Sequence, residues 1–307
     1  MESRSHSEDG KRGARARALV WLFIIFLWPI RPAAGQEPPY FSPENILRFA
    51  DFLYQEKDYL RAAAEYRRYL SYGDVQPAAA APVYFKIGLC YRLARDYPKS
   101  VSAFQAVLEK YPHSEAAEDS YCQIAYSHFL GGRYEESLSS VEAFFPKTGS
   151  EERKLKLSHL KGLNYLYQKK WQKAEDYFRS LGEKTAENPV TAALKTFAEQ
   201  GKHLPHRSPF LAGALSTLIP GTGRIYAGRT SDGLLSLLTV AVTGWQAYEG
   251  FHKDGARSVK GWIFGSLSAF FYLGNIYGSV VAVRVFNEQS EMKFLEKIGV
   301  SVHVFFQ

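Results

Sequence analysis

The residues most suggestive of chemistry form a short glycine-rich loop, Gly221-Thr222-Gly223, of the kind that can cradle a phosphate group. Phosphate-binding loops of the dinucleotide and Walker types follow a strand and carry their glycines at fixed spacings. The next glycine, Gly228, fits neither spacing, and no strand pattern precedes the loop. We therefore interpret the loop as a break between helices and predict no bound cofactor.

The other candidates for catalysis or metal binding are two hinge histidines, His203 and His206, and two cysteines, Cys90 and Cys122. The chain has no His-Glu-x-x-His motif, no nucleophile elbow and no paired cysteines with zinc spacing. The sequence thus predicts no enzyme activity, no catalytic residue and no metal site. We interpret the cysteines as buried thiols, and a disulfide in an oxidising compartment is the alternative.

The glycine-rich loop lies in the apolar C-terminal third, and we interpret residues 208–285 as a membrane domain. Ser231–Ala247 holds one charge, Asp232, and Gly261–Val283 holds none. A run of about 20 apolar residues crosses a bilayer, and small residues at every fourth position let membrane helices pack closely. The sequence predicts two transmembrane helices followed by a tail, residues 286–307. A buried pair of soluble helices is the alternative.

Five residues around the loop resemble the Pro-Gly-x-Gly-x-x-Tyr-x-Gly motif of small bacterial membrane domains, including the two-helix TM2 type. They are Pro220, Gly221, Gly223, Tyr226 and Gly228. The resemblance implies a topology rather than an activity. Broken backbone at membrane depth needs shielding by protein or water. We therefore expect Pro209–Ile219 to be a short half-inserted helix, with Arg224 and Tyr226 at the surface. A full third span is the alternative.

Four segments within residues 43–200 share one pattern of small and aromatic residues. The small residues are Ala50, Gly88, Ala125 and Gly162, at steps of 38, 37 and 37. The aromatic residues that follow them are Tyr59, Tyr97, Tyr134 and Trp171. The pattern resembles the tetratricopeptide repeat, a helical hairpin that buries its apolar face by stacking on its neighbours. A further helix over Asn188–Gln200, stopped by Gly201, would cap the array.

A tetratricopeptide array implies a concave binding surface built from the first helix of each hairpin. The partner-binding residues that the template implies are Arg48, Tyr54, Lys86, Arg92, Gln123, Tyr126, Phe129, His159 and Tyr167. This mixture of aromatic and cationic side chains suits a peptide or a flexible protein segment. The Asn with which chaperone-binding members clamp a terminal carboxylate is missing, so that activity is not carried over. The alternative is that several of these side chains only pack between repeats.

The N-terminus has the pattern of a signal peptide, residues 1–35. Basic residues from Lys11 to Arg17 precede an apolar run, Leu19–Trp28, and small residues precede Gln36. The run is shorter than the roughly 20 residues of a spanning helix, and an uncleaved signal anchor is the alternative. Either way we expect the repeats in a bacterial periplasm and the hairpin in the inner membrane. The basic link between the two spans agrees with the positive-inside bias.

Composition bounds the function. Of the 307 residues, 46% are apolar and 22% are charged, which excludes intrinsic disorder for most of the chain. The net charge of +7 is too mild to indicate nucleic-acid binding. The sequence therefore predicts an all-α protein, a tetratricopeptide solenoid followed by a transmembrane helical hairpin. We expect a non-catalytic scaffold for a protein or peptide partner in envelope assembly, in contact with membrane lipid. The alternative is a small channel, or a lipid- or insertion-related membrane module, regulated by its repeats.

Overall fold

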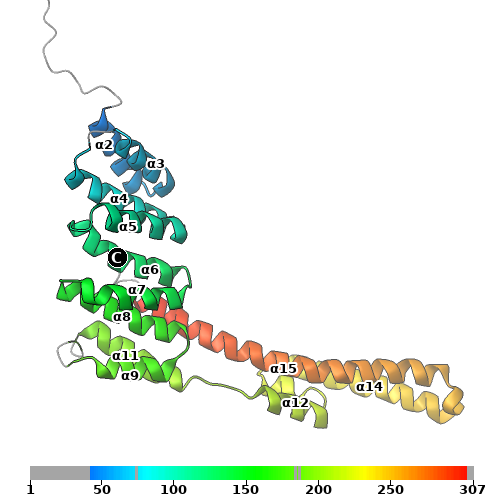
Figure 1. Ribbon diagram of the computed structural model, residues 1–307. Helices are drawn as coiled ribbons and strands as arrows, with labels where there is room; N and C mark the ends of the chain where they lie inside the picture. The colour runs from blue at the N-terminus through cyan, green and yellow to red at the C-terminus, as the bar shows by residue number, and fades with distance from the viewer. Residues whose placement is uncertain (1–41, 73–74, 183–184, 186–187, 303–307) are drawn as a thin grey trace, which may run out of the picture. The chain divides into compact units, whose positions relative to one another are not determined.

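The computed structural model describes residues 42–72, 75–182, 185 and 188–302, except for the side chains of residues 300–302. Every regular element of these residues is a helix, which confirms the predicted all-α class (Figure 1). The chain divides into two compact units, residues 1–75 and 76–307. The predicted signal peptide, residues 1–35, lies outside the described residues.

Unit 1 contains one helical hairpin among its described residues. Its helices are α2 (Pro43–Gln55) and α3 (Tyr59–Leu70). The side chains of Ser42 and Asp58 start these helices, because each accepts a hydrogen bond from a backbone N–H of the first turn. Ala50 and Tyr66 are fully buried, as expected for the small and aromatic positions of the repeat pattern.

Unit 2 begins with three more hairpins and a single helix. They are α4 (Pro77–Leu93) with α5 (Tyr97–Lys110), α6 (Glu115–Leu130) with α7 (Tyr134–Phe144) and the short η1 (Phe145–Lys147), α8 (Glu151–Tyr167) with α9 (Trp171–Ser180), and α11 (Pro189–Lys202). Successive hairpins stack on one another (Figure 1). The expected capping helix is present, but it continues past Gly201, because that glycine is buried in the helix against Trp171, where a Cβ would come within 2.5 Å of the indole ring.

The turn inside each hairpin repeats the same backbone conformation. Lys57, Arg95, Gly132 and Lys169 have φ angles of 63°, 62°, 72° and 58°. Left-handed backbone is rare for residues other than glycine. Its recurrence at the same position of each turn shows that the four hairpins share one register.

Small residues bring the two helices of a hairpin together as the pattern predicts. A Cβ on Gly88 would lie 2.5 Å from the ring of Phe104, and one on Gly162 would overlap the ring of Phe178. The Ser100 hydroxyl donates to the backbone oxygen of Gly88 at 2.9 Å, and Ser137 makes the same bond to Ala125 at 2.9 Å. Two of the hairpins are thus closed by a ring contact, at Gly88 and Gly162, and two by an equivalent buried hydrogen bond, at Gly88 and Ala125.

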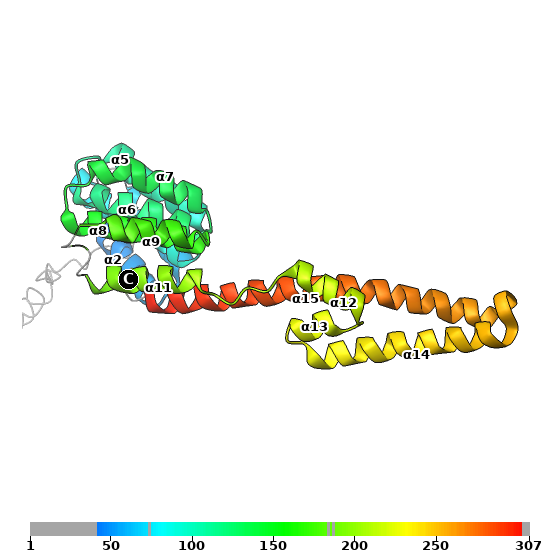
Figure 2. The same cartoon turned by 90° about the horizontal axis from the view of Figure 1, so that it is seen from below.

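The rest of unit 2 is a long helical hairpin with two short helices at its base. The short helices are α12 (Pro209–Leu218) and α13 (Thr222–Tyr226); the long ones are α14 (Thr230–Asp254) and α15 (Val259–Val302), joined by η2 (Gly255–Arg257). Two views show α14 running beside α15, with α12 and α13 against them (Figures 1 and 2). The expected tail is not separate from the second long helix, because α15 continues without a break through residues 286–302.

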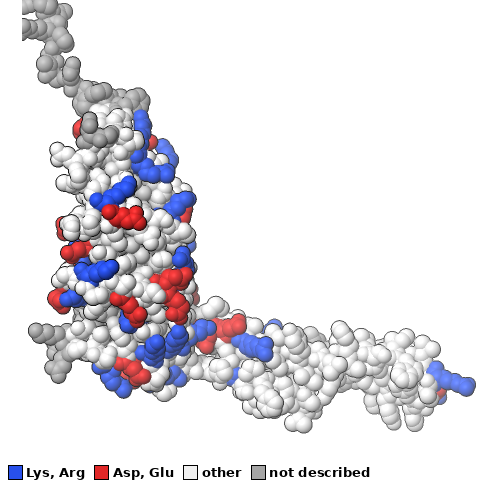
Figure 3. Space-filling model, in the orientation of Figure 1, with Lys and Arg blue, Asp and Glu red and all other residues white. Residues whose placement is uncertain are grey.

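The long hairpin presents apolar side chains to its surroundings. Leu235, Trp245, Trp262 and Phe270 are each more than 60% exposed. On the face shown in Figure 3, charged side chains gather on the repeats and at the far end of the hairpin. Within the described residues, one helix is long and apolar enough to cross a membrane, in the stretch Val259–Gly299.

Candidate functional site

Four predicted partner-binding residues contact one another across the first helices of three repeats. The guanidinium of Arg92, on α4, lies 5.4 Å from the ring centroid of Tyr126, on α6. The ring of Tyr126 stacks on Phe129 at 6.3 Å, and Phe129 meets Tyr167, on α8, edge to face at 4.9 Å. We call Arg92, Tyr126, Phe129 and Tyr167 the first-helix row.

The other predicted residues of unit 2 flank this row or lie beneath it. Lys86 and Gln123 are half-buried on α4 and α6. His159 is 5% exposed, and its Nε2 lies 2.8 Å from the hydroxyl of Thr191. Burial disfavours the charged imidazolium and lowers the pKa of His159 to about 4. His159 therefore faces the interior between α8 and α11.

Two predicted residues belong to unit 1. Arg48 is exposed on α2, with its guanidinium bonded to the side chain of Asn45. Tyr54 packs edge to face on Tyr59, with ring centroids 5.7 Å apart. Two other predicted residues, Tyr126 and His159, are buried. Their burial matches the alternative that some of the predicted side chains only pack between repeats.

The C-terminal end of α15 covers the end of the first-helix row. The hydroxyl of Tyr167 donates to the backbone oxygen of Leu295 at 3.4 Å, and Lys169 forms an ion pair with Glu291. Phe294 meets the rings of Trp171 and Phe197, with centroids 5.7 and 6.0 Å away.

The last repeats and the C-terminal end of α15 therefore share one apolar cluster. Phe294 and Ile298 are buried in the same cluster as side chains of α8, α9 and α11. This contact was not predicted from the sequence, although a signal was present. Phe294 and Ile298 are spaced by one helical turn, within charged residues that suggest a solvated tail.

The glycine motif, residues 220–228, interrupts the helical structure between α12 and α13. Buried side chains form hydrogen bonds with the backbone groups that this interruption leaves open. The Gly221 N–H donates to Oδ1 of Asn275 at 3.0 Å, and the Gly223 N–H donates to Oγ of Ser216 at 3.0 Å. The Ser216 hydroxyl in turn donates to Ser279 at 2.7 Å. α12 and α15 thus supply hydrogen-bond partners for both backbone groups that the break leaves open.

The motif glycines also fix how closely α12, α13 and α14 approach. Gly221 has a φ of 91°, and a Cβ there would overlap the carbonyl of Gly233. A Cβ on Gly223 would overlap the carbonyl of Ala212. Gly228 has a φ of 85° in the turn before α14, and Pro220 is half-buried beside Gly221.

Arg224 and Tyr226, which we expected at the surface, are each half-buried. The Tyr226 hydroxyl accepts a hydrogen bond from the Ser208 N–H at 3.2 Å, and its backbone oxygen accepts one from Arg207. The Arg224 guanidinium lies over Gly278 of α15, where a Cβ would come within 2.5 Å of Nη2. α13 therefore turns Arg224 toward α15, into the space that the small residue Gly278 leaves open.

Two further groups complete the chemistry. Cys90 is buried and Cys122 is half-buried, and burial raises the pKa of the Cys122 thiol to about 11. At the end of α14, hydrogen bonds from Lys253 and Lys260 lower the pKa of Glu249 to about 2. Three of the charges in the predicted link between the spans are therefore held in one ion-paired group.

Comparison with known proteins identifies one of the repeats. Residues 83–114, which form most of α4 and all of α5, match the tetratricopeptide repeat family model. A search of curated proteins gives no match to the chain. The matched segment contains Gly88, Tyr97 and Phe104, which carry the small and aromatic pattern. The chain thus contains a tetratricopeptide repeat, a module that binds proteins and is not itself catalytic.

Proposed function

We propose that this protein is a non-catalytic scaffold of the bacterial cell envelope, anchored in the inner membrane, whose repeats bind an extended segment of a protein partner. The tetratricopeptide match supports protein binding. The first-helix row supports an extended ligand, because aromatic and guanidinium groups follow one another over three repeats.

The observation that carries the proposal is that one segment is already bound beside this surface. The end of α15 packs an aromatic anchor, Phe294, between Trp171 and Phe197. It adds an ion pair from Glu291 to Lys169. An amphipathic helix held by such anchors is a common mode of peptide recognition. The partner segment would continue this arrangement along the row.

The anchor is the α14–α15 hairpin, with lipid around its exposed apolar side chains. α15 has 44 residues, which at 1.5 Å per residue gives about 66 Å. This is longer than the roughly 30 Å hydrocarbon core of a bilayer. Because the end of α15 contacts the last repeats, we place the repeats and that end on one side of the membrane, in the periplasm. An even number of crossings, namely two, then follows.

The test is crosslinking and capture of the full-length protein from its native membrane. A double variant, Lys86→Glu with Arg92→Glu, reverses two cations on α4. The matched control, Arg67→Glu with Lys147→Glu, makes the same charge change at exposed positions outside the first helices. We expect a partner that is captured by the wild type and the control and lost with the α4 variant. Capture of the same partners by all three proteins would overturn the row as the binding surface.

A second candidate function is a membrane module whose activity the repeats regulate. The observation that favours it is that α15 is one continuous helix. It contacts the glycine motif through Asn275 and the last repeats through Phe294. Replacing residues 208–285 with an unrelated two-span hairpin, while keeping residues 286–307, separates the two functions. A scaffold keeps its activity with the foreign hairpin, and a membrane module loses it.

A further inference from the structure

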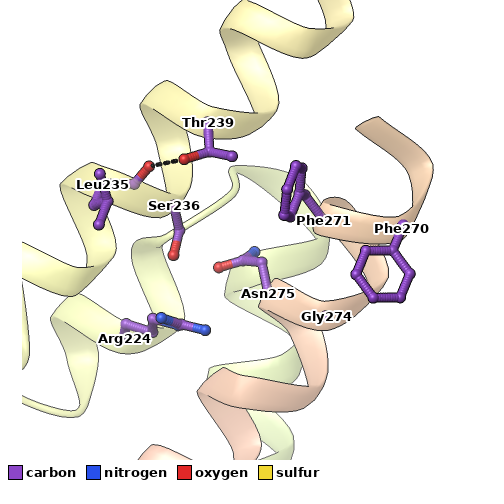
Figure 4. A pocket seen from close by; sticks show the side chains of 8 residues that line it. All are labelled: Arg224, Leu235, Ser236, Thr239, Phe270, Phe271, Gly274 and Asn275. Carbon is purple, nitrogen blue, oxygen red and sulfur yellow. Dashed lines mark hydrogen bonds between the residues drawn. The ribbon is translucent and has the colours of Figure 1, made fainter. Parts of the chain in front are cut away.

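A pocket opens between α13, α14 and α15, next to the glycine motif. Its volume is about 300 Å³. In Figure 4, the side chains of Arg224, Ser236 and Asn275 point toward the pocket from these three helices. The rim is apolar, with Leu235 and Phe270 at 66% and 72% exposed.

Two polar groups of the pocket lack partners. Asn275 is 3% exposed, and while its Oδ1 accepts the Gly221 N–H, its Nδ2 is buried without a hydrogen bond. The Nε of Arg224 is likewise buried without a hydrogen bond. The part of the chain that the structure describes gives Arg224 no ion pair; the acid that follows it, Asp232, pairs with Arg229 instead. A half-buried guanidinium whose Nε is buried without a partner and a buried amide donor left open in the same pocket favour an anion.

We propose that this pocket binds the phosphate group of an anionic phospholipid, with Arg224 and Asn275 Nδ2 as donors. Guanidinium groups pair strongly with phosphate oxygens. The exposed side chains of Leu235 and Phe270 would contact the acyl chains at the mouth of the pocket. The pocket lies in the first turns of α14, Leu235 being five residues from its start, and thus near the headgroup level of a hairpin inserted as proposed above.

This inference rests on insertion of the hairpin, so insertion is measured first. The full-length protein is incorporated into nanodiscs of phosphatidylcholine, with or without one fifth phosphatidylglycerol. A chain that enters neither disc overturns the membrane anchor. A chain that enters both but shows no preference for phosphatidylglycerol overturns only the lipid site.

Binding is then measured by native mass spectrometry of the full-length protein in detergent, titrated with phosphatidylglycerol. We expect Arg224→Gln to weaken binding about tenfold or more, as for the loss of a charge-assisted hydrogen bond. The matched control is Arg229→Gln, which removes the same charge from an exposed residue nearby. Equal affinities for Arg224→Gln and wild type, or equal losses for both variants, would overturn the proposal.

Two further arms keep the test decisive. Leu235→Trp narrows the mouth of the pocket without touching the polar groups, so it is expected to weaken binding even if Arg224→Gln alters folding. Retained affinity in a folded Leu235→Trp protein counts against the pocket. Inorganic phosphate at millimolar concentration should not displace the lipid. Full displacement would mean that the site takes free phosphate, which overturns the lipid assignment.

Discussion

Glycines hold helices together in both the repeats and the base of the long hairpin, but they face different neighbours. In the repeats, Gly88 and Gly162 face the rings of Phe104 and Phe178. In the glycine motif, Gly221 and Gly223 face backbone carbonyls of α14 and α12. A ring can rotate or be replaced by a smaller side chain, whereas a backbone carbonyl inside a helix cannot move without breaking it. The motif should therefore tolerate substitution much less than the repeats.

The largest effect is expected from Gly221→Ala. The new Cβ would overlap the Gly233 carbonyl, at a backbone φ of 91° that alanine rarely adopts. We expect a loss of about 3–5 kcal/mol in the free energy of unfolding, the upper range for point mutations. Thermal unfolding in detergent, followed by circular dichroism, measures it. The control is Gly274→Ala, where a Cβ meets nothing within 4 Å. Equal melting temperatures for the two variants would contradict the view that the backbone contacts of the motif cannot accommodate a Cβ.

A smaller effect is expected from Gly162→Ala in the repeats. The added methyl would press on the ring of Phe178, which is 1% exposed, and overpacking of this kind costs about 1–3 kcal/mol. Because the obstacle is a side chain, Phe178→Leu in the same protein should restore part of the loss. Urea unfolding of the single and double variants tests this, with Gly182→Ala as control because its Cβ would meet open space. No rescue in the double variant would mean that the backbone is the obstacle here too.

The repeats also contain a buried titratable group, His159, whose pKa is lowered from 6.5 to about 4 by burial. Between these two values the unfolded chain binds more protons than the folded one, so the free energy of unfolding falls as the pH drops through this window. The loss between pH 7.5 and pH 5 is on the order of 1–2 kcal/mol. We expect His159→Gln, which keeps a hydrogen-bonding group near Thr191, to flatten this dependence in urea unfolding. A slope that persists in the variant would assign it to other groups.

The smallest effect is expected at a hairpin turn. Arg95 adopts the same left-handed conformation that Gly132 adopts in the next repeat. Left-handed backbone costs roughly 1 kcal/mol for a residue with a Cβ, so Arg95→Gly should raise the free energy of unfolding by up to about that amount. The gain contrasts with Gly221, whose left-handed backbone is enclosed by its neighbours. A decrease in stability in the same urea experiment would show that the Arg95 side chain contributes more than its strain.

The sequence predicted the repeats and the long hairpin, and it missed contacts between segments that are far apart in the chain. The steps between Ala50, Gly88, Ala125 and Gly162 predict the register of the hairpins, because all four small residues are buried, and Gly88 and Gly162 each lie against a ring of the second helix. The apolar runs likewise predicted the long hairpin. Three features depend on contacts between distant segments. They are the packing of Arg224 over Gly278, the burial of His159 against Thr191, and the docking of Phe294 onto the last repeats. The residues of a single helix do not show which distant helix its partly polar face will contact.

Because α15 is one continuous helix, its length and its rotation both determine where its C-terminal end meets the repeats. Each residue added to an α-helix advances its end by about 1.5 Å and turns it by about 100°. Inserting two residues between Val285 and Ser290 would therefore carry Phe294 away from its place between Trp171 and Phe197 by rotation alone, whereas seven residues would restore its direction about 10 Å further along. The rotation of this helix thus fixes which way the last repeats face relative to the α14–α15 hairpin.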